Sequence, residues 1–272
     1  MQVGIHLPHA GEQATPERIR RAAQQAEDMG LSDVWVSEHI IVPRASFPRS
    51  PLFYDPVLSL TWAAAVTRRV RLGTSVLVLP MRHPLPLAKE LATLQNFSEG
   101  RLILGAGVGW LEAEFAALGA PFHERGRRTD EGIAMMRAVW SEDPVTFRTK
   151  YIPAEISEMS MQPFPVRPIP IWFGARSEAA YRRTVKTGDG WHGSQLTPVQ
   201  AAPIVARLRR DRPEPEFTIS MRTHWDGKDE GLLRARIAAY GEVGVQHIMV
   251  HPQDRDVDDW DAVIEGTGRV AA

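Results

Sequence analysis

The chain has 272 residues, a formal net charge of −1 and 43% hydrophobic residues. This near-neutral balance gives no general electrostatic attraction to nucleic acid or to a membrane surface. The absence of cysteine excludes disulfides, thiol nucleophiles and thiolate metal sites. The first residues lack the features of a secretory signal peptide, and no apolar run reaches membrane-spanning length, so we expect a cytoplasmic protein.

The first half of the chain alternates short apolar runs with amphipathic segments. The runs at 70–79 and 102–106 are apolar without strict alternation, as in parallel strands covered by helices on their outer faces. A helix is predicted to begin at Thr15, with Pro16 in its first turn and an apolar stripe at helical spacing. The predicted strands are 3–7, 34–36, 70–79 and 102–106, and the predicted helices are 15–30, 55–66 and 85–97.

The second half continues the alternation after one interruption. Residues 145–168 carry several prolines and no clear period, which predicts an irregular insertion or a small hairpin over the barrel mouth, after the fourth strand–helix unit. The predicted helices are 129–140, 177–186, 198–209, 230–243 and 257–265, and the predicted strands are 169–173, 190–192, 217–221 and 247–250. Eight such units in about 250 residues favour an α/β fold, a single-domain TIM (β/α)8 barrel over residues 1–272. An open doubly wound sheet is the alternative.

Small and polar residues follow two of these strands, at Thr74-Ser75 and at 105–109. Ligands of parallel α/β folds bind at the carboxyl ends of strands, and glycines there let a flat ligand approach the backbone. The glycine-rich segment is not a dinucleotide fingerprint, because Trp110 stands where G-x-G-x-x-G requires glycine.

Taken together, these motifs resemble the bacterial luciferase-like family, in particular its branch of oxidoreductases that use the deazaflavin coenzyme F420. The resemblance rests on VWVSEH at 34–39, LGTSV at 72–76, SEGRL at 98–102, ERGRRTDE at 124–131 and GDGW at 188–191. It implies hydride transfer between F420 and a small organic substrate, with an FMN-dependent monooxygenase as the alternative. It also leads us to expect a homodimer.

The catalytic candidate is His39, at the end of the second predicted strand. An imidazole titrates near neutrality and can move a proton during hydride transfer, and the resemblance implies a catalytic histidine here. A structural histidine at a strand end is the alternative. Glu38 stands where the branch usually has Asp; we expect it to contact the cofactor and to act on the imidazole as its acidic neighbour.

The resemblance also implies cofactor contacts after the third and fourth strands. At Thr74, Ser75 and Val76 it implies a cis peptide between Ser75 and Val76 that supports the central ring of the cofactor. An ordinary strand end is the alternative. The loop of Gly107, Val108 and Gly109 is expected beside the tail of the cofactor. Sugar-phosphate dehydrogenases of this branch have an acidic residue at the position of Trp110, so we expect a larger or more apolar substrate.

An anion site is predicted at Gly174, Ala175, Arg176 and Ser177, where a strand leads into a helix. Free backbone amides at a helix start attract phosphate, and late barrel loops often bind one. The resemblance implies the cofactor phosphate here, whereas a simple helix cap by Ser177 is the alternative.

A metal-dependent barrel hydrolase is the competing class of enzyme, since the chain has nine histidines. We assign no metal ligands, because His6 and His9 do not form a tight His-x-His pair and Pro252 follows His251. His83 and His192 lie near predicted strand ends and are further candidates for lining the pocket.

Overall fold

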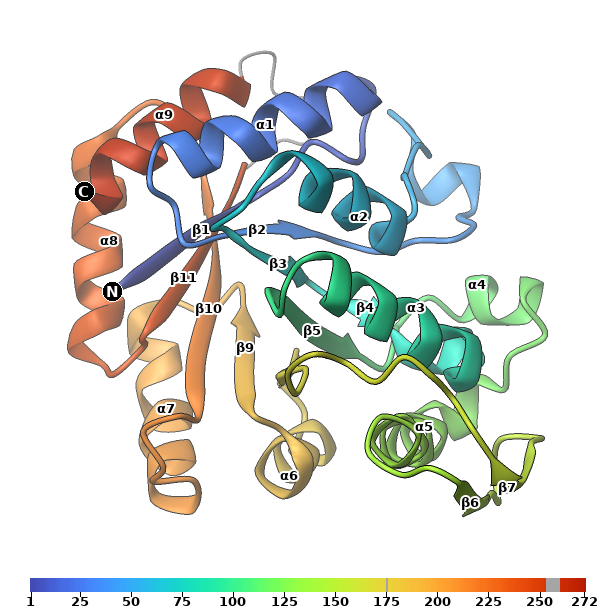
Figure 1. The fold of residues 1–272 in the computed structure, drawn as a ribbon. Helices are drawn as coiled ribbons and strands as arrows, with labels where there is room; N and C mark the ends of the chain where they lie inside the picture. The colour runs from blue at the N-terminus through green and yellow to red at the C-terminus, as the bar shows by residue number, and fades with distance from the viewer. Residues whose placement is uncertain (175, 253–259) are drawn as a thin grey trace.

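The computed structural model describes residues 1–174, 176–252 and 260–272. Its central feature is a closed barrel of eight parallel strands inside a ring of helices (Figure 1). The barrel strands are β1 (Gln2–His6), β2 (Asp33–Val36), β3 (Arg71–Thr74), β5 (Leu102–Gly107), β8 (Ile171–Phe173), β9 (Gly190–Ser194), β10 (Thr218–Trp225) and β11 (His247–Pro252). Pairing of β3 with β5, with Leu72 opposite Leu102, closes the circle. The TIM barrel prediction is therefore confirmed, and the open-sheet alternative is wrong.

Helices follow the strands, and most of them pack on the outside of the barrel. They are α1 (Pro16–Asp28), α2 (Pro56–Val66), α3 (Pro84–Phe97), α4 (Glu112–Ala117), α5 (Arg125–Val139), α6 (Glu178–Thr187), α7 (Pro198–Asp211), α8 (Glu230–Glu242) and α9 (Trp260–Ala271), with short 3-10 helices at Arg44–Ser46, Leu79–Met81 and Phe122–Glu124. Several begin as the sequence predicts: the Thr15 side chain accepts from the Arg18 amide, and Asp55 accepts from the Leu58 amide. These caps fix the helix starts close to the strand ends.

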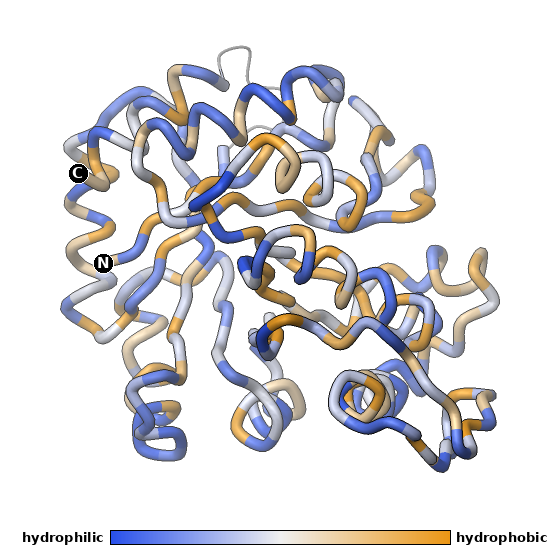
Figure 2. The backbone as a smooth tube through the Cα atoms, in the orientation of Figure 1, coloured by the Kyte–Doolittle hydropathy of each residue, from blue (hydrophilic) through white to orange (hydrophobic). Residues whose placement is uncertain are grey.

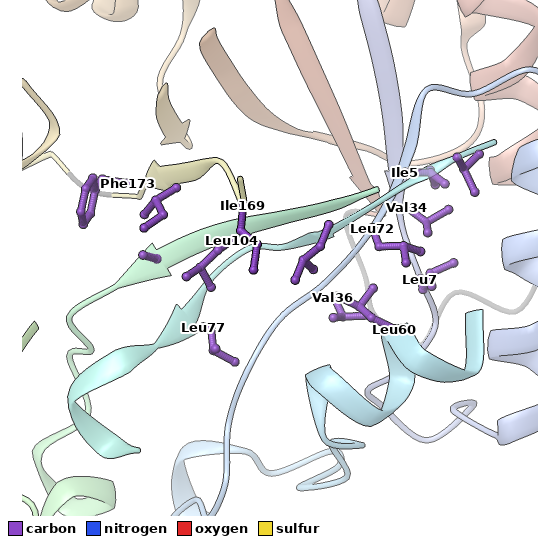
Figure 3. Close-up of a cluster of buried hydrophobic side chains, with 14 of the residues drawn as sticks. Ile5, Leu7, Val34, Val36, Leu60, Leu72, Leu77, Leu104, Ile169 and Phe173 are labelled. Atoms are coloured by element: carbon purple, nitrogen blue, oxygen red, sulfur yellow. The ribbon is translucent and has the colours of Figure 1, made fainter. Parts of the chain in front are cut away.

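Apolar side chains fill two layers. The outer layer lies between strands and helices, where Ile5, Val34 and Leu72 belong to the same buried cluster as Leu60 of α2, which lies beside Val36 (Figure 3). Hydrophobic stretches accordingly follow the strands and recur along the surrounding helices (Figure 2). The second layer fills the barrel itself with Trp35, Ile103, Trp172 and Met249. Branched aliphatic residues usually fill the interior of such a barrel. Here two tryptophans occupy much of that space.

The third strand differs from its prediction as a single run over 70–79. It divides into β3 and the short β4 (Leu77–Val78), which continues the pairing with β5. The peptide bond between Ser75 and Val76, in the interval, is cis. This confirms the cis peptide expected from the resemblance.

The insertion is a hairpin, as one of the two predicted alternatives stated, but it does not lie over the barrel mouth. Its strands β6 (Val145–Arg148) and β7 (Glu155–Met159) pair antiparallel and pack beside α5 (Figure 1). Glu131 of α5 fixes the turn by accepting hydrogen bonds from three consecutive backbone amides, those of residues 150–152. The helix expected at 257–265 corresponds to α9, which begins at Trp260 and continues to Ala271. Residues 257–259 of the expected range lie outside the described residues.

No helix within the described parts of the chain is both long enough and apolar enough to cross a membrane.

Candidate active site

A cavity of about 630 Å³ opens at the carboxyl ends of the barrel strands. This is the face at which TIM barrels carry their chemistry, and the volume is in the usual range for small-molecule sites. The loops after β2, β3, β5 and β8 contribute to its wall, together with β10 and α4. Most of the predicted site residues line it: Glu38, His39, Ser75, Val76, Gly107, Val108, Gly109 and Gly174.

His39 forms a pair with a carboxylate from a distant part of the chain. Its Nδ1 atom lies 3.0 Å from Oε2 of Glu114, which belongs to α4. The second carboxylate oxygen of Glu114 accepts hydrogen bonds from the amides of Ile40 at 2.6 Å and Ile41 at 3.2 Å. Glu114 therefore fixes both the imidazole and the loop that carries it.

The electrostatics of this pair assign the proton on His39. Burial alone raises the pKa of Glu114, but the bonds from His39 and from the two loop amides outweigh burial and hold that pKa below its ordinary value of 4.5. An ionised carboxylate only accepts hydrogen bonds, so Nδ1 of the imidazole donates to it. In neutral His39 this leaves Nε2 unprotonated, as a group that can accept a proton in the cavity.

Glu38 is not the acidic partner of His39, and this corrects the expectation from the sequence. Its Oε1 atom accepts from Nε of Arg82 at 2.6 Å, and its Oε2 atom accepts from the Val78 amide at 2.5 Å. Arg82 also pairs with Asp55, at 2.6 Å. The Glu38 carboxylate is thus bound by Arg82 and a backbone amide, while the imidazole of His39 pairs with Glu114. Burial raises the pKa of Glu38, although Arg82 and the Val78 amide oppose the shift.

Aromatic side chains surround His39. The ring centroids of Phe47 and Phe53 lie 5.0 Å and 4.9 Å from the imidazole centroid, both edge-on. The Trp110 ring lies 6.2 Å away and at 90°. Phe47 and Trp110 line the cavity, and Trp110 is 67% exposed. The neighbourhood of the imidazole is therefore apolar and open to a ligand.

Two of the predicted glycines, Gly107 and Gly174, leave space for the side chain of Val76 as well as for a ligand. A Cβ atom at Gly107 would lie 2.3 Å from Cγ2 of Val76, and one at Gly174 would lie 2.7 Å from its Cγ1. Non-bonded contacts of a Cβ atom are essentially never this short. The side chain of Val76 is thereby held between two strands, at the floor of the cavity.

The other residues of this strand end take different positions. Thr74 does not line the cavity: it is buried, and its hydroxyl donates to the carbonyl of Gly105 at 2.8 Å. Ser75 lines the cavity, and its carbonyl accepts from Nη1 of Arg222 at 3.4 Å. Arg222 is the only Arg or Lys among the described residues that line the cavity.

The sequence model of the luciferase-like monooxygenase family matches residues 1–264 of the chain. The chain belongs to this family. Over 186 residues it is 34% identical to an F420-dependent glucose-6-phosphate dehydrogenase of Kineococcus radiotolerans, an alignment that covers 67% of this chain and 53% of the relative. The chain thus spans about half the length of the curated relatives it matches first.

Solved structures share the fold of this luciferase-like chain. An F420-dependent secondary alcohol dehydrogenase in complex with an F420–acetone adduct superposes with a TM-score of 0.80 at 18% identity, covering 99% of this chain and 97% of that one. The monooxygenase RslO1 from Streptomyces bottropensis gives a TM-score of 0.80 at 22% identity, covering 100% and 96%. At such identities the likeness shows the fold alone.

The predicted anion site of the luciferase-like barrel is divided in the structure. Gly174 faces the main cavity, whereas Arg176 and Ser177 line a second hollow of about 260 Å³ beside α6 and α7. Ser177 caps α6 by accepting from the Ala180 amide, and Arg176 donates to Gln195 at 3.1 Å. Ala175 lies outside the described residues.

Two further candidates for lining the pocket lie elsewhere. His83 accepts from the Leu85 amide at the start of α3, and His192 is buried beneath Ser75. In the part of the chain that the structure describes, no three His, Asp or Glu side chains gather in a way that could hold a metal ion.

The sequence missed Glu114 and Arg222, which complete the cavity of the luciferase-like chain. Glu114 lies in a six-residue helix, too short for a periodic signal. Arg222 is the one Arg or Lys in the largely buried strand β10, and a charge there was the available signal of an inward-facing functional group.

Proposed function

We propose that the chain is an F420-dependent oxidoreductase that moves hydride between the deazaflavin and an uncharged organic alcohol or carbonyl compound. The observation that carries this proposal is the His39–Glu114 pair, set with its unprotonated Nε2 beside aromatic side chains in the cavity at the catalytic end of the barrel. Family membership and the F420-dependent relative, which is 34% identical, support the choice of cofactor.

The residues present fit a flat cofactor with an anionic tail. Val76, held between Gly107 and Gly174, offers an apolar surface for the ring. The loop 107–109 and the start of α6, with Arg176, offer backbone amides and a positive charge for the tail. When bound, F420 supplies the hydride acceptor in one direction of the reaction and the hydride donor in the other.

The chain supplies the proton chemistry. In alcohol oxidation the C–H bond of the carbinol carbon loses its electron pair as hydride, and Nε2 of His39 takes the hydroxyl proton. Glu114 then stabilises the imidazolium, because its carboxylate remains ionised beside Nδ1. In carbonyl reduction the same groups return the proton to the product oxygen.

The lining of the cavity favours an uncharged, partly apolar substrate. Phe47 and Trp110 form the wall beside His39, and Arg222 lies at the floor, against the carbonyl of Ser75. A phosphorylated sugar would require positive charge close to the imidazole, where these aromatic rings stand. We therefore propose a substrate class that differs from that of the glucose-6-phosphate dehydrogenase relative.

A side-by-side titration of the purified protein with F420 and with FMN, followed by fluorescence, tests the cofactor. We expect tighter binding of F420. Arg176→Ala should weaken that binding by about 1–2 kcal/mol if its guanidinium meets the cofactor phosphate. Arg182→Ala, which removes an exposed arginine of α6, is the matched control and should leave the affinity unchanged.

Equal or tighter binding of FMN would replace the proposal by its alternative, an FMN-dependent monooxygenase. The description of the family as luciferase-like monooxygenases supports that alternative.

A further inference from the structure

A continuous chain of hydrogen bonds runs through the barrel interior and ends at the cavity. From the cavity inward, Oγ of Ser75 lies 2.9 Å from Nε2 of His192, and Nδ1 of His192 lies 2.7 Å from Oγ of Ser220. The same Ser220 oxygen lies 2.7 Å from Nδ1 of His247, whose Nε2 lies 2.8 Å from Oδ1 of Asp33. We call these five residues the interior relay; each is at most 5% exposed.

The relay is built into the register of the sheet. Ser220 of β10 stands directly opposite His192 of β9 and His247 of β11, so the three side chains occupy one level of the barrel. The Trp35 ring stacks on His192 at 5.1 Å with 4° between the planes, and Trp172 lies 5.3 Å from His247. These aromatic walls hold the imidazoles in place and shield them from water.

Two titratable groups of the relay, Asp33 and His192, differ in their charge. Burial opposes ionisation of Asp33, but His247 and Arg71, whose Nη2 lies 2.6 Å from Oδ2, hold the pKa of that carboxyl well below its ordinary value. The indole of Trp35 also donates to it. Burial lowers the pKa of His192 to about 3, with His247 and Arg222 acting in the same direction and Asp33 opposing them. Asp33 is therefore ionised and His192 neutral.

Counting protons along the relay leaves two complete arrangements. When His247 is neutral, its Nε2 donates to Asp33, Ser220 donates to His247, Nδ1 of His192 donates to Ser220, and Ser75 donates to Nε2 of His192. When His247 carries a second proton, every bond between it and Ser75 reverses. Nε2 of His192 then donates to Ser75, whose own hydroxyl proton is free to point into the cavity.

We propose that the interior relay transfers one proton between His247 and a nitrogen or oxygen atom of a ligand bound against Ser75. The Ser75 O–H bond breaks as the ligand gains a proton, and Ser75 is reprotonated from Nε2 of His192. His192 takes a proton at Nδ1 from Ser220, which is reprotonated from Nδ1 of His247. His247 ends neutral and the other groups keep their charge. The proposal rests on the proposed function only for the identity of the acceptor, a group that gains a proton when hydride is transferred.

The test reads the imidazoles directly, in the protein without cofactor. Protein labelled with ¹⁵N-histidine is titrated between about pH 5 and about pH 9, and ring ¹H–¹⁵N correlations report which nitrogen of each histidine carries a proton. We expect His192 to carry its proton on Nδ1 while His247 is neutral, and on Nε2 once His247 is doubly protonated. A His192 proton that stays in place while His247 titrates, or a His247 that never changes, would overturn the relay.

Ser220→Ala removes the central link and should let His247 titrate with no response at His192. Thr223→Ala removes another buried hydroxyl from β10, outside the relay, and should leave the coupled change intact. Coupling that survives in Ser220→Ala would also refute the relay, and the wild-type titration stands if that variant does not fold. If the wild-type protein shows the coupled titration but does not bind F420, the relay stands and the proposed function is refuted.

Discussion

The molecule contains two histidine–carboxylate pairs in contrasting settings. The mouth pair, His39 with Glu114, joins a loop to a short helix, and its imidazole is 12% exposed. The interior pair, His247 with Asp33, joins two barrel strands and is completely buried. The mouth pair can therefore contact a substrate directly, whereas the interior pair can act on a substrate only through intervening groups.

The carboxylates also differ in what else they hold. Glu114 binds two loop amides and so fixes a loop next to the cavity, and loops are in general more mobile than helices and strands. Asp33 binds the guanidinium of Arg71 and the indole of Trp35, which are parts of the barrel. The comparison predicts that damage to the interior pair costs stability, whereas damage to the mouth pair costs turnover.

The largest effect is expected for Asp33→Ala. It leaves His247 and Arg71 without their shared buried anion, which should lower the free energy of unfolding by about 3–5 kcal/mol. Chemical denaturation followed by circular dichroism measures this loss. Asp261→Ala, which removes a partly exposed pair with Arg21, should cost less than about 1 kcal/mol. If both variants lost a similar free energy of unfolding, the buried Asp33 pairs would contribute no more to stability than the surface pair of Asp261.

His39→Ala should lower turnover by about 100-fold or more, while cofactor affinity stays within a few-fold, because the imidazole moves a proton and does not hold the ring. Steady-state kinetics and a cofactor titration check the two parts. His83→Ala removes an exposed histidine that caps α3 and serves as the control. If turnover is unchanged, or if stability and cofactor binding fall together, His39 is structural.

A smaller loss, about tenfold in turnover, is expected for Glu114→Gln. The amide keeps the shape of the side chain but can donate to Nδ1, which favours the wrong tautomer of His39 and no longer stabilises an imidazolium. Glu112→Gln changes an exposed carboxylate of the same helix and should retain full turnover. Equal kinetics of the two variants would show that His39 needs no anionic partner.

The smallest effect is a pH dependence of stability. Because the folded protein holds the pKa of Glu114 below 4.5, its ionised form stabilises the fold above that pH, and the contribution disappears as pH falls through the lowered pKa. The stability difference between wild type and Glu114→Gln should therefore shrink on acidification. Denaturation curves at neutral pH and at several acidic values measure it, and a difference that stays constant contradicts the assignment.

The sequence predicted the elements that have local signals. Helix caps such as Thr15 and Asp55, and the apolar run of β5, depend on neighbouring residues, so composition and spacing are sufficient for them. The cis peptide after Ser75 came from a family motif instead. His39 was found because a titratable residue lies close after a predicted strand and because the family resemblance implies a catalytic histidine there.

The partners of these residues could not be predicted in the same way. Glu114 lies 75 residues from His39, and only the closed barrel brings the two loops together. Glu38 was chosen because it adjoins His39 in sequence, but its carboxylate is bound by Arg82 and the Val78 amide, which come from a later part of the chain. Within the barrel, Ser220 and His247 sit in strands that read as apolar core, and their alignment depends on strand register, which no local pattern contains.

The two hydrogen bonds that Glu114 accepts from the loop have a kinetic consequence. Ile40 and Ile41 have exposed side chains, at 45% and 53%, and lie outside any helix or strand, so their amide protons would ordinarily exchange rapidly with solvent. Bound to a buried carboxylate, they exchange only when that carboxylate lets go. The rate of deuterium uptake at these two amides therefore reports how often the active-site loop opens. It can be measured before any substrate is known.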